Sequence, residues 1–152
     1  MIGAGYVGLV SGACFSDIGN TVWCVDNDKK KIELLNNNKI PIFEPGLEEI
    51  VRKNYSASRL IFTTNLKFAV KKSDIIFICV GTPTSEKNRS ADLRHVFKVA
   101  AEIGKYINKF KIIVTKSTVP VTTGDKIEKL ISKKKTKKIV RGGLKSRISK
   151  RR

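Results

Sequence analysis

One short stretch decides the fold class of this chain of 152 residues: Gly3-Ala4-Gly5-Tyr6-Val7-Gly8, a Gly-x-Gly-x-x-Gly sequence ahead of a predicted helix over 6–18. In a dinucleotide-binding turn the first glycine permits a tight turn and the second lets a pyrophosphate approach the backbone. The third glycine lets the following helix pack closely on a sheet. The anion then meets free N–H groups and the partial positive charge at the helix N-terminus. Taken alone, the stretch is also compatible with a plain glycine turn.

Asp26 supplies the second half of the pattern. It follows Gly8 by 18 residues and comes directly after a predicted strand over 21–25. A carboxylate at this place is expected to bond both ribose hydroxyls of an adenosine. Because an acid there disfavours a 2′-phosphate, we predict NAD rather than NADP as the cofactor. The alternative interpretation, a turn followed by a helix-capping aspartate, is the less favoured one.

Apolar strands and amphipathic helices alternate along the rest of the chain. The expected strands are 21–25, 60–63, 74–80 and 111–115, and the expected helices are 6–18, 29–36, 47–54, 66–71, 92–107 with Asp92 as its cap, and 123–132. Such alternation predicts an α/β fold, a Rossmann-type doubly wound parallel sheet with helices on both faces and right-handed crossovers. The apolar run 75–81 has the length of a buried strand and is far too short for a membrane span.

The beginning of the chain departs from this pattern. Only Met1 and Ile2 precede the glycine turn, so the first strand is largely missing. In this topology the strand lies mid-sheet, and each Val- or Ile-type side chain it buries is worth about 1.5–3 kcal/mol. The whole stability of a domain is only about 5–15 kcal/mol. We therefore expect either a true start further upstream or a poorly folded product.

The net charge of +18 is concentrated at the other end. Residues 132–152 hold 11 of the 31 Lys and Arg residues and no Asp or Glu, which leaves 20 basic and 13 acidic residues, a net charge of +7, in 1–131. We divide the chain into a NAD-binding domain, 1–131, and a basic tail, 132–152, predicted to be disordered. The tail has no aromatic side chain on which bases could stack. A tail read out of frame is therefore the preferred hypothesis, ahead of nucleic-acid binding.

The cysteines and the single histidine indicate no metal centre. Cys14, Cys24 and Cys79 are widely spaced among apolar neighbours, which predicts buried, reduced thiols in a cytoplasmic protein rather than disulfides. His95, on the long helix beside a basic neighbour, is expected to face solvent. No export leader precedes the first motif, and no membrane partner is predicted.

Four strings together resemble the UDP-glucose/GDP-mannose dehydrogenase family. They are Ile2-Gly3-Ala4-Gly5-Tyr6-Val7-Gly8-Leu9-Val10, Pro41-Ile42-Phe43-Glu44-Pro45-Gly46-Leu47, Val80-Gly81-Thr82-Pro83-Thr84, and Lys116-Ser117-Thr118-Val119-Pro120 with Gly124. They are similar to the family's opening loop, its P-I-Y/F-E-P-G-L segment, its V-G-T-P loop and its K-S-T-V-P…G segment. The likeness runs from Ile2 to about Ile131, in order and at the family's spacing.

The resemblance implies a set of site residues. Gly3, Gly5 and Gly8, with Tyr6 and Val7 between them, would surround the pyrophosphate, although neither Tyr6 nor Val7 receives a chemical role. Asp26 and Lys31 would hold the adenosine ribose. Gly81, Thr82 and Pro83 would line the cofactor, and Thr118 would be the catalytic residue that faces the nicotinamide and helps to position a water.

The resemblance also implies an activity that these residues do not complete. The family oxidises the C6 alcohol of a nucleotide sugar to a carboxylate with two NAD, through a thiohemiacetal and a thioester on a cysteine, and UDP-glucose is the favoured sugar. The family's N-P-E-F-L segment, dimerisation helix and nucleophilic cysteine have no counterpart here. We therefore expect a NAD-binding half that is inactive alone, with UDP-glucose binding and homodimerisation confined to the full-length enzyme. The alternatives are a non-catalytic NAD-binding remnant, half of a split enzyme or, less favoured, a basic nucleic-acid-binding protein.

Overall fold

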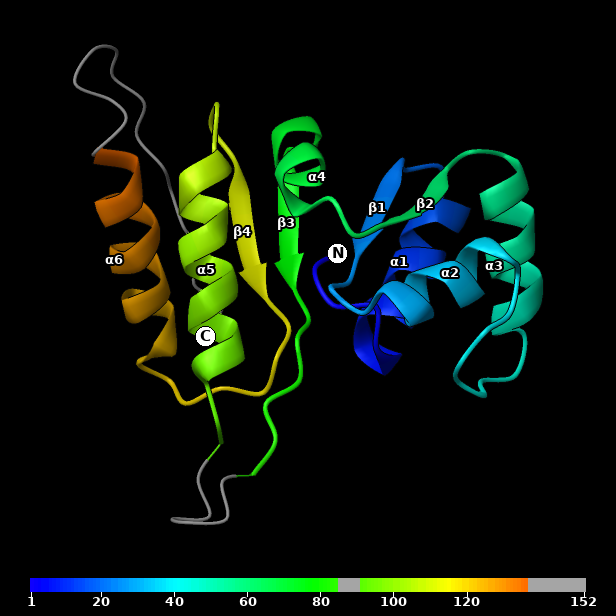
Figure 1. Cartoon of the computed structure of the whole chain (residues 1–152), viewed down its shortest axis with the longest axis horizontal. Helices are drawn as coiled ribbons and strands as arrows, with labels where there is room; N and C mark the ends of the chain where they lie inside the picture. The colour runs from blue at the N-terminus through cyan, green and yellow to red at the C-terminus, as the bar shows by residue number, and fades with distance from the viewer. Residues whose placement is uncertain (85–90, 137–152) are drawn as a thin grey trace.

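The computed structural model describes residues 1–84 and 91–136. Strands and helices alternate as the sequence predicts (Figure 1). The strands are β1 (Val22–Val25), β2 (Leu60–Thr63), β3 (Ile75–Ile78) and β4 (Ile112–Thr115). The helices are α1 (Tyr6–Asp17), α2 (Lys29–Asn36), α3 (Leu47–Ser56), α4 (Leu66–Lys72), α5 (Arg94–Tyr106) and α6 (Thr123–Thr136).

The sheet consists of two parallel pairs joined by the first residues of the chain. β1 pairs with β2, and β3 pairs with β4. Ile2 forms parallel bridges to Val25 of β1 and to Ile78 of β3. Its N–H donates to the Phe77 carbonyl at 2.8 Å, and its carbonyl accepts from the Cys79 N–H at 2.8 Å. The spatial order is therefore β2, β1, the segment 1–3, β3 and β4, with the N-terminus between the two halves (Figure 1).

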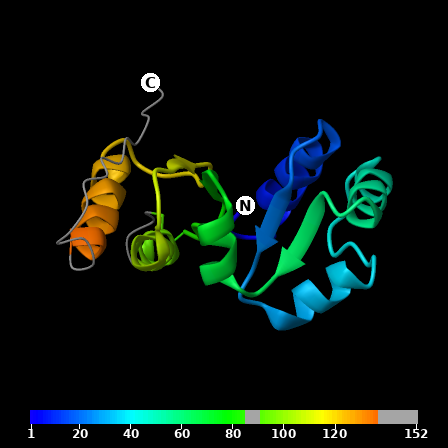
Figure 2. The ribbon, with the colours of Figure 1, turned by 90° about the horizontal axis from the view of Figure 1, so that it is seen from above.

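This order makes the sheet doubly wound. The chain runs outward from its centre through β1 and β2, then returns to place β3 and β4 on the opposite side. In Figure 2 the segments α1–α3 and α4–α6 accordingly lie on opposite sides of the N-terminus. In such a sheet, ligands bind outside the carboxyl ends of the strands, at the point where the order reverses. That point lies beside the glycine turn, between β1 and β3.

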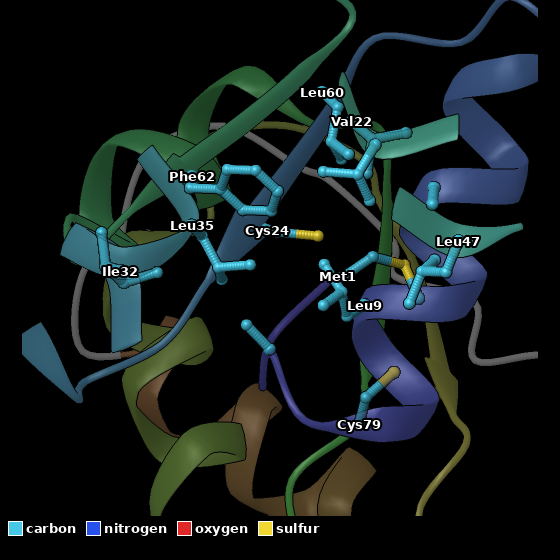
Figure 3. Packing of buried hydrophobic residues seen from close by; sticks show 13 residues of the cluster. Met1, Leu9, Val22, Cys24, Ile32, Leu35, Leu47, Leu60, Phe62 and Cys79 are labelled. Atoms are coloured by element: carbon cyan, nitrogen blue, oxygen red, sulfur yellow. The ribbon is translucent and has the colours of Figure 1, made fainter. Parts of the chain in front are cut away.

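A separate apolar cluster holds each half together. In the first cluster Met1, Leu9 and Leu35 pack with residues of β1, β2 and α3 (Figure 3). In the second, Ile2 packs with buried side chains of β3, β4, α5 and α6, among them Ile78. Because Met1 and Ile2 belong to different clusters, the short first strand contributes side chains to both halves.

Two predicted boundaries were wrong. Asp92 does not cap α5: the N-cap is Leu93, and the Asp92 carboxylate accepts instead from the N–H and guanidinium of Arg94. The first intrahelical bond runs from the Phe97 N–H to the Leu93 carbonyl at 3.0 Å, so the helix begins one residue later than predicted, and the Asp92 N–H is bonded instead to the Pro83 carbonyl at 2.8 Å.

The predicted start of the disordered tail was also wrong. α6 continues through Thr136, so residues 133–136 are helical. Ile127 and Ile131 are buried and anchor the preceding turns, and lysine is a good helix former. The rest of the predicted tail, 137–152, lies outside the described residues.

Candidate functional site

The glycine turn has the local geometry that its spacing predicts. Gly3 has a φ of +103°, and a Cβ there would lie 2.8 Å from the Cys79 carbonyl oxygen. A Cβ on Gly8 would lie 1.8 Å from the Gly3 carbonyl oxygen, so α1 packs directly against the turn. A Cβ on Gly5, by contrast, would meet no atom of the described residues within 4 Å. Gly3 and Gly8 therefore shape the turn, and Gly5 leaves an open approach to its backbone.

Gly5 is also the N-cap of α1 and carries no side chain that could occupy the first N–H groups of the helix. The first N–H groups of a helix have no partner within the helix, and they carry the positive end of its dipole. An anion that approaches over Gly5 would meet these groups. The open side of Gly5 thus fits a pyrophosphate.

Asp26 faces the turn from the end of β1. Its Oδ2 accepts from the Ala4 N–H and from the Lys31 Nζ, each at 2.9 Å, and its Oδ1 accepts from the Asp28 N–H at 3.0 Å. Burial raises the pKa of this carboxyl, but the hydrogen bonds from Lys31 and from the two backbone N–H groups outweigh burial and hold the pKa below its ordinary value. Asp26 is therefore a carboxylate at neutral pH.

A cavity of about 470 Å³ opens at the switch point of the sheet. We call it the switch-point cavity. It is lined by the glycine turn, by the segments that follow β1, β2 and β3, and by one face of α5. Its volume lies in the range of small-molecule and cofactor sites, about 300–1,000 Å³.

The switch-point cavity brings together some of the predicted site residues. Those that line it are Gly3, Gly5, Asp26, Lys31 and Gly81. They come from four separate segments, the glycine turn, the end of β1, α2 and the segment after β3, so only the fold places them on one surface. Their contact with a cofactor remains a prediction.

The other predicted residues lie beside the cavity rather than in its wall. Tyr6 and Val7 open α1 and are about half exposed, and the Tyr6 hydroxyl donates to the Glu44 carboxylate. Gly8 contacts the turn, as described above. Thr82 and Pro83 continue the segment after Gly81.

Thr118 is exposed in the segment that follows β4. Its neighbour Ser117 donates its hydroxyl to the Val80 carbonyl at 2.7 Å. This bond holds the Thr118 segment beside the end of β3, and therefore near Gly81. The catalytic role of Thr118 remains a prediction.

The α5 face and Gly12 were not predicted from the sequence. His95, Lys98, Val99 and Glu102 line the switch-point cavity at i, i+3, i+4 and i+7 spacing, a helical periodicity that was present in the sequence. Gly12 lies inside α1, and a Cβ there would meet the Cys24 sulfur at 2.6 Å. A glycine within a helix was the available signal for this close packing of α1 on β1.

The three cysteines differ in their environments. Cys24 is buried, and burial raises its pKa to about 11. Burial also raises the pKa of Cys79. Cys14 was predicted to be buried and is exposed, because Ala13 and Ser16 form the packed face of α1. Neither buried thiol has the lowered pKa and access that a nucleophile needs.

Within residues 1–84 and 91–136, no group of three or more His, Cys, Asp and Glu side chains could hold a metal ion. No helix in the same ranges is long and apolar enough to cross a membrane.

The depressed pKa of Asp26 predicts how stability depends on pH. A carboxyl whose pKa is lower in the folded than in the unfolded chain stabilises the fold above its unfolded pKa, about 3.9, and loses this contribution as pH falls through the folded pKa. We expect Asp26→Asn to cost about 1–3 kcal/mol between about pH 5 and 8, and this cost to shrink below about pH 4. Urea unfolding of both proteins across this range measures the difference, and a cost that grows on acidification would contradict the assignment.

Comparison with known proteins agrees with this geometry. The profile described as "UDP-glucose/GDP-mannose dehydrogenase family, NAD binding domain" matches residues 1–149. The chain is 54% identical over 131 residues to a UDP-glucose 6-dehydrogenase of Rhizobium meliloti, which covers 86% of this chain and 30% of that protein. It is 52% identical over 133 residues to UDP-glucose 6-dehydrogenase TuaD of Bacillus subtilis, covering 88% and 29%. The chain thus spans about 30% of the length of these curated relatives.

Solved structures give the same picture. A GDP-mannose dehydrogenase from Pseudomonas aeruginosa, in a ternary complex, superposes with a TM-score of 0.84 at 42% identity, covering 89% of this chain and 32% of the other. A UDP-glucose dehydrogenase from Pyrobaculum islandicum superposes with a TM-score of 0.83 at 34% identity, covering 88% and 32%. The chain therefore belongs to the UDP-glucose/GDP-mannose dehydrogenase family and corresponds to its NAD-binding Rossmann domain.

Proposed function

We propose that residues 1–152 bind NAD in the switch-point cavity as the cofactor half of a nucleotide-sugar 6-dehydrogenase whose substrate is UDP-glucose. The observation that carries the proposal is the Asp26 carboxylate, held 2.9 Å from the Ala4 N–H of the glycine turn. This bond supports the proposal, because it holds a carboxylate suited to ribose hydroxyls beside a helix N-terminus suited to a pyrophosphate. The names of the curated relatives with 54% and 52% identity support UDP-glucose over other sugars.

Each residue has a physical role in this proposal. The open side of Gly5 admits the pyrophosphate to the N-terminus of α1. Asp26 bonds the ribose hydroxyls of the adenosine, and Lys31 keeps that carboxylate ionised and oriented. The segment 81–83 lines the cofactor beyond the pyrophosphate, and Thr118 positions a water at the reacting carbon. Bound NAD supplies the hydride acceptor.

We place the remaining chemistry outside these 152 residues. The proposed reaction takes an alcohol to a carboxylate in two oxidations through a thioester, and this requires an accessible thiolate. Burial raises the pKa of both Cys24 and Cys79, which argues against either as that thiolate. Cys14 is exposed but does not line the switch-point cavity, which argues against it as well. The nucleotide-sugar site and the homodimer contact are likewise assigned to the part of the longer relatives that this chain does not span. The free cysteines fit a reducing compartment, so we propose a cytoplasmic location.

This division of labour predicts binding without turnover. The purified chain is expected to bind NAD in calorimetry and to form no NADH when UDP-glucose is added, because the proposal assigns both the nucleotide-sugar site and the nucleophile to the part of the longer relatives that this chain does not span. The absorbance of NADH reports turnover, and a curated relative of full length serves as the positive control. NADH formation by the 152 residues, dependent on UDP-glucose, would show that a nucleotide-sugar site lies within them and would contradict this division.

A further inference from the structure

The segment 41–47 is a family string without an assigned role. None of its residues lines the switch-point cavity. Its Glu44 carboxylate accepts from the hydroxyl of Tyr6, 38 residues earlier in the chain. Because Tyr6 belongs to the string that contains the glycine turn, this hydrogen bond joins two of the four family strings.

The backbone around Glu44 is held in place independently of that bond. Gly46 has a φ of +78° and is the N-cap of α3, and the Leu47 N–H donates to the Glu44 carbonyl at 3.1 Å. Leu47 is buried in the first apolar cluster, which also holds Leu9 of α1 (Figure 3), and Ile42 packs against the same cluster. Glu44 therefore presents its carboxylate from a fixed backbone on the α3 side of the glycine turn.

The other end of the bond lies in the first turn of α1, which Tyr6 opens directly after Gly5. The first N–H groups of a helix have no partner within it, and in α1 it is the Leu9 N–H that donates to the Gly5 carbonyl, at 2.8 Å. The N–H groups of Tyr6 and Val7 are therefore among those that an anion would meet at this helix N-terminus. The side chains of Tyr6 and Val7 are 53% and 44% exposed, so packing holds this turn only in part. The bond to Glu44 attaches the turn to the loop before α3.

We propose that Tyr6 and Glu44 are positioning residues for the cofactor. Their hydrogen bond keeps the first turn of α1 in the orientation that presents its N–H groups to the pyrophosphate of NAD. Donors that are already oriented bind a ligand at a smaller cost in conformational entropy, and neither side chain needs to contact the cofactor. The inference rests on the proposed function, because it assumes that the pyrophosphate binds at the N-terminus of α1.

The charge of Glu44 makes the positioning role distinguishable from direct attraction. A carboxylate and a pyrophosphate repel each other, so loss of the charge alone would strengthen NAD binding or leave it unchanged. Loss of the hydrogen bond would weaken NAD binding. The amide of a glutamine is neutral but keeps an oxygen that accepts from a hydroxyl, so two substitutions of Glu44 separate the bond from the charge.

The test compares NAD dissociation constants, measured by calorimetry at one salt concentration. Tyr6→Phe and Glu44→Ala are each expected to weaken NAD binding about three- to tenfold, the net effect of about one hydrogen bond. The double variant is expected to be no weaker than either single variant, because all three lack the same bond. Glu44→Gln is expected to bind NAD within about twofold of the unchanged chain, because it keeps the acceptor.

Two matched controls remove the same groups elsewhere. Tyr55→Phe removes the hydroxyl of a tyrosine that is stacked on Phe62 and does not line the cavity. Glu49→Ala removes an exposed carboxylate of α3. Both are expected to leave the NAD dissociation constant unchanged. A thermal melt of each sample shows that the titrated protein is folded, so that a role in stability alone would lower the melting temperature without changing the dissociation constant.

The outcomes separate this inference from the proposed function. If the unchanged chain does not bind NAD, the proposed function fails. If it binds NAD and the folded Tyr6→Phe and Glu44→Ala variants bind equally well, only the positioning role fails. The positioning role also fails if Glu44→Gln weakens binding as much as Glu44→Ala, or if the effects of Tyr6→Phe and Glu44→Ala multiply in the double variant, because the two side chains would then act independently.

Discussion

Gly8→Ala is expected to remove a large part of the free energy of unfolding of the chain. A Cβ at this position would lie 1.8 Å from the Gly3 carbonyl oxygen and 3.0 Å from its carbon. Both are backbone atoms of the glycine turn, and no change of rotamer can move them away. Relief would require α1 to shift from the sheet, which would open the cluster around Leu9. We expect a cost of about 3 kcal/mol or more, a large part of a total stability of about 5–15 kcal/mol.

Thermal and urea unfolding followed by circular dichroism measure this effect. Gly124→Ala is the matched control, because a Cβ there meets no atom of the described residues within 4 Å and the residue lies in the first turn of α6. The control is expected to stabilise the chain by up to about 1 kcal/mol through helix propensity. A Gly8→Ala variant that melts like the unchanged chain would show that α1 does not pack on the turn as described.

Gly5→Ala is expected to have the opposite effect. The chain keeps its fold but loses affinity for NAD. The backbone of Gly5 has φ −80° and ψ −168°, which an alanine adopts without strain. A Cβ there contacts no described atom within 4 Å, but it would stand in the approach to the N-terminus of α1. We expect NAD affinity to fall by at least about 30-fold, because at least one hydrogen bond to the charged pyrophosphate would be lost.

Calorimetric titration with NAD and a thermal melt of the same sample separate the two effects. Gly124→Ala is the control here as well. Gly81→Ala would be a less informative control, because Gly81 itself lines the switch-point cavity. A Gly5→Ala variant that binds NAD like the unchanged chain would place the pyrophosphate elsewhere. A variant that loses its cooperative melt would contradict the open environment described for Gly5.

Local geometry explains why much of the site could be predicted from the sequence. The turn from Gly3 to Gly8 depends on backbone conformation and close approach within six residues, so the glycines themselves carry the information. Asp26 could be placed because it comes directly after a short predicted strand. In a parallel sheet the carboxyl ends of the strands lie at the same edge. The order of strands and helices could be predicted from the periodicity of apolar residues, which is also a local signal.

The parts that could not be predicted depend on packing between distant elements. The α5 face lines the switch-point cavity only because β3 and α5 follow the return of the chain across the sheet. His95 is exposed, as predicted, but its place in the cavity wall depends on that return. The capping position was mistaken by one residue, because the backbone bond that opens α5 is accepted by Leu93 and not by Asp92. The burial of Cys14 was predicted wrongly because apolar residues occur on both faces of this helix. Which face packs against the sheet depends on the orientation of the helix about its axis.

The central claim is that the switch-point cavity binds NAD through the Asp26 carboxylate and the glycine turn. Calorimetric titration of the chain with NAD, beside an Asp26→Ala variant whose folding is checked by its melt, tests this claim most directly. We predict saturable binding with one NAD per chain, weakened at least about tenfold in the variant. No binding to a folded chain, or equal binding to the folded Asp26→Ala variant, would contradict the account.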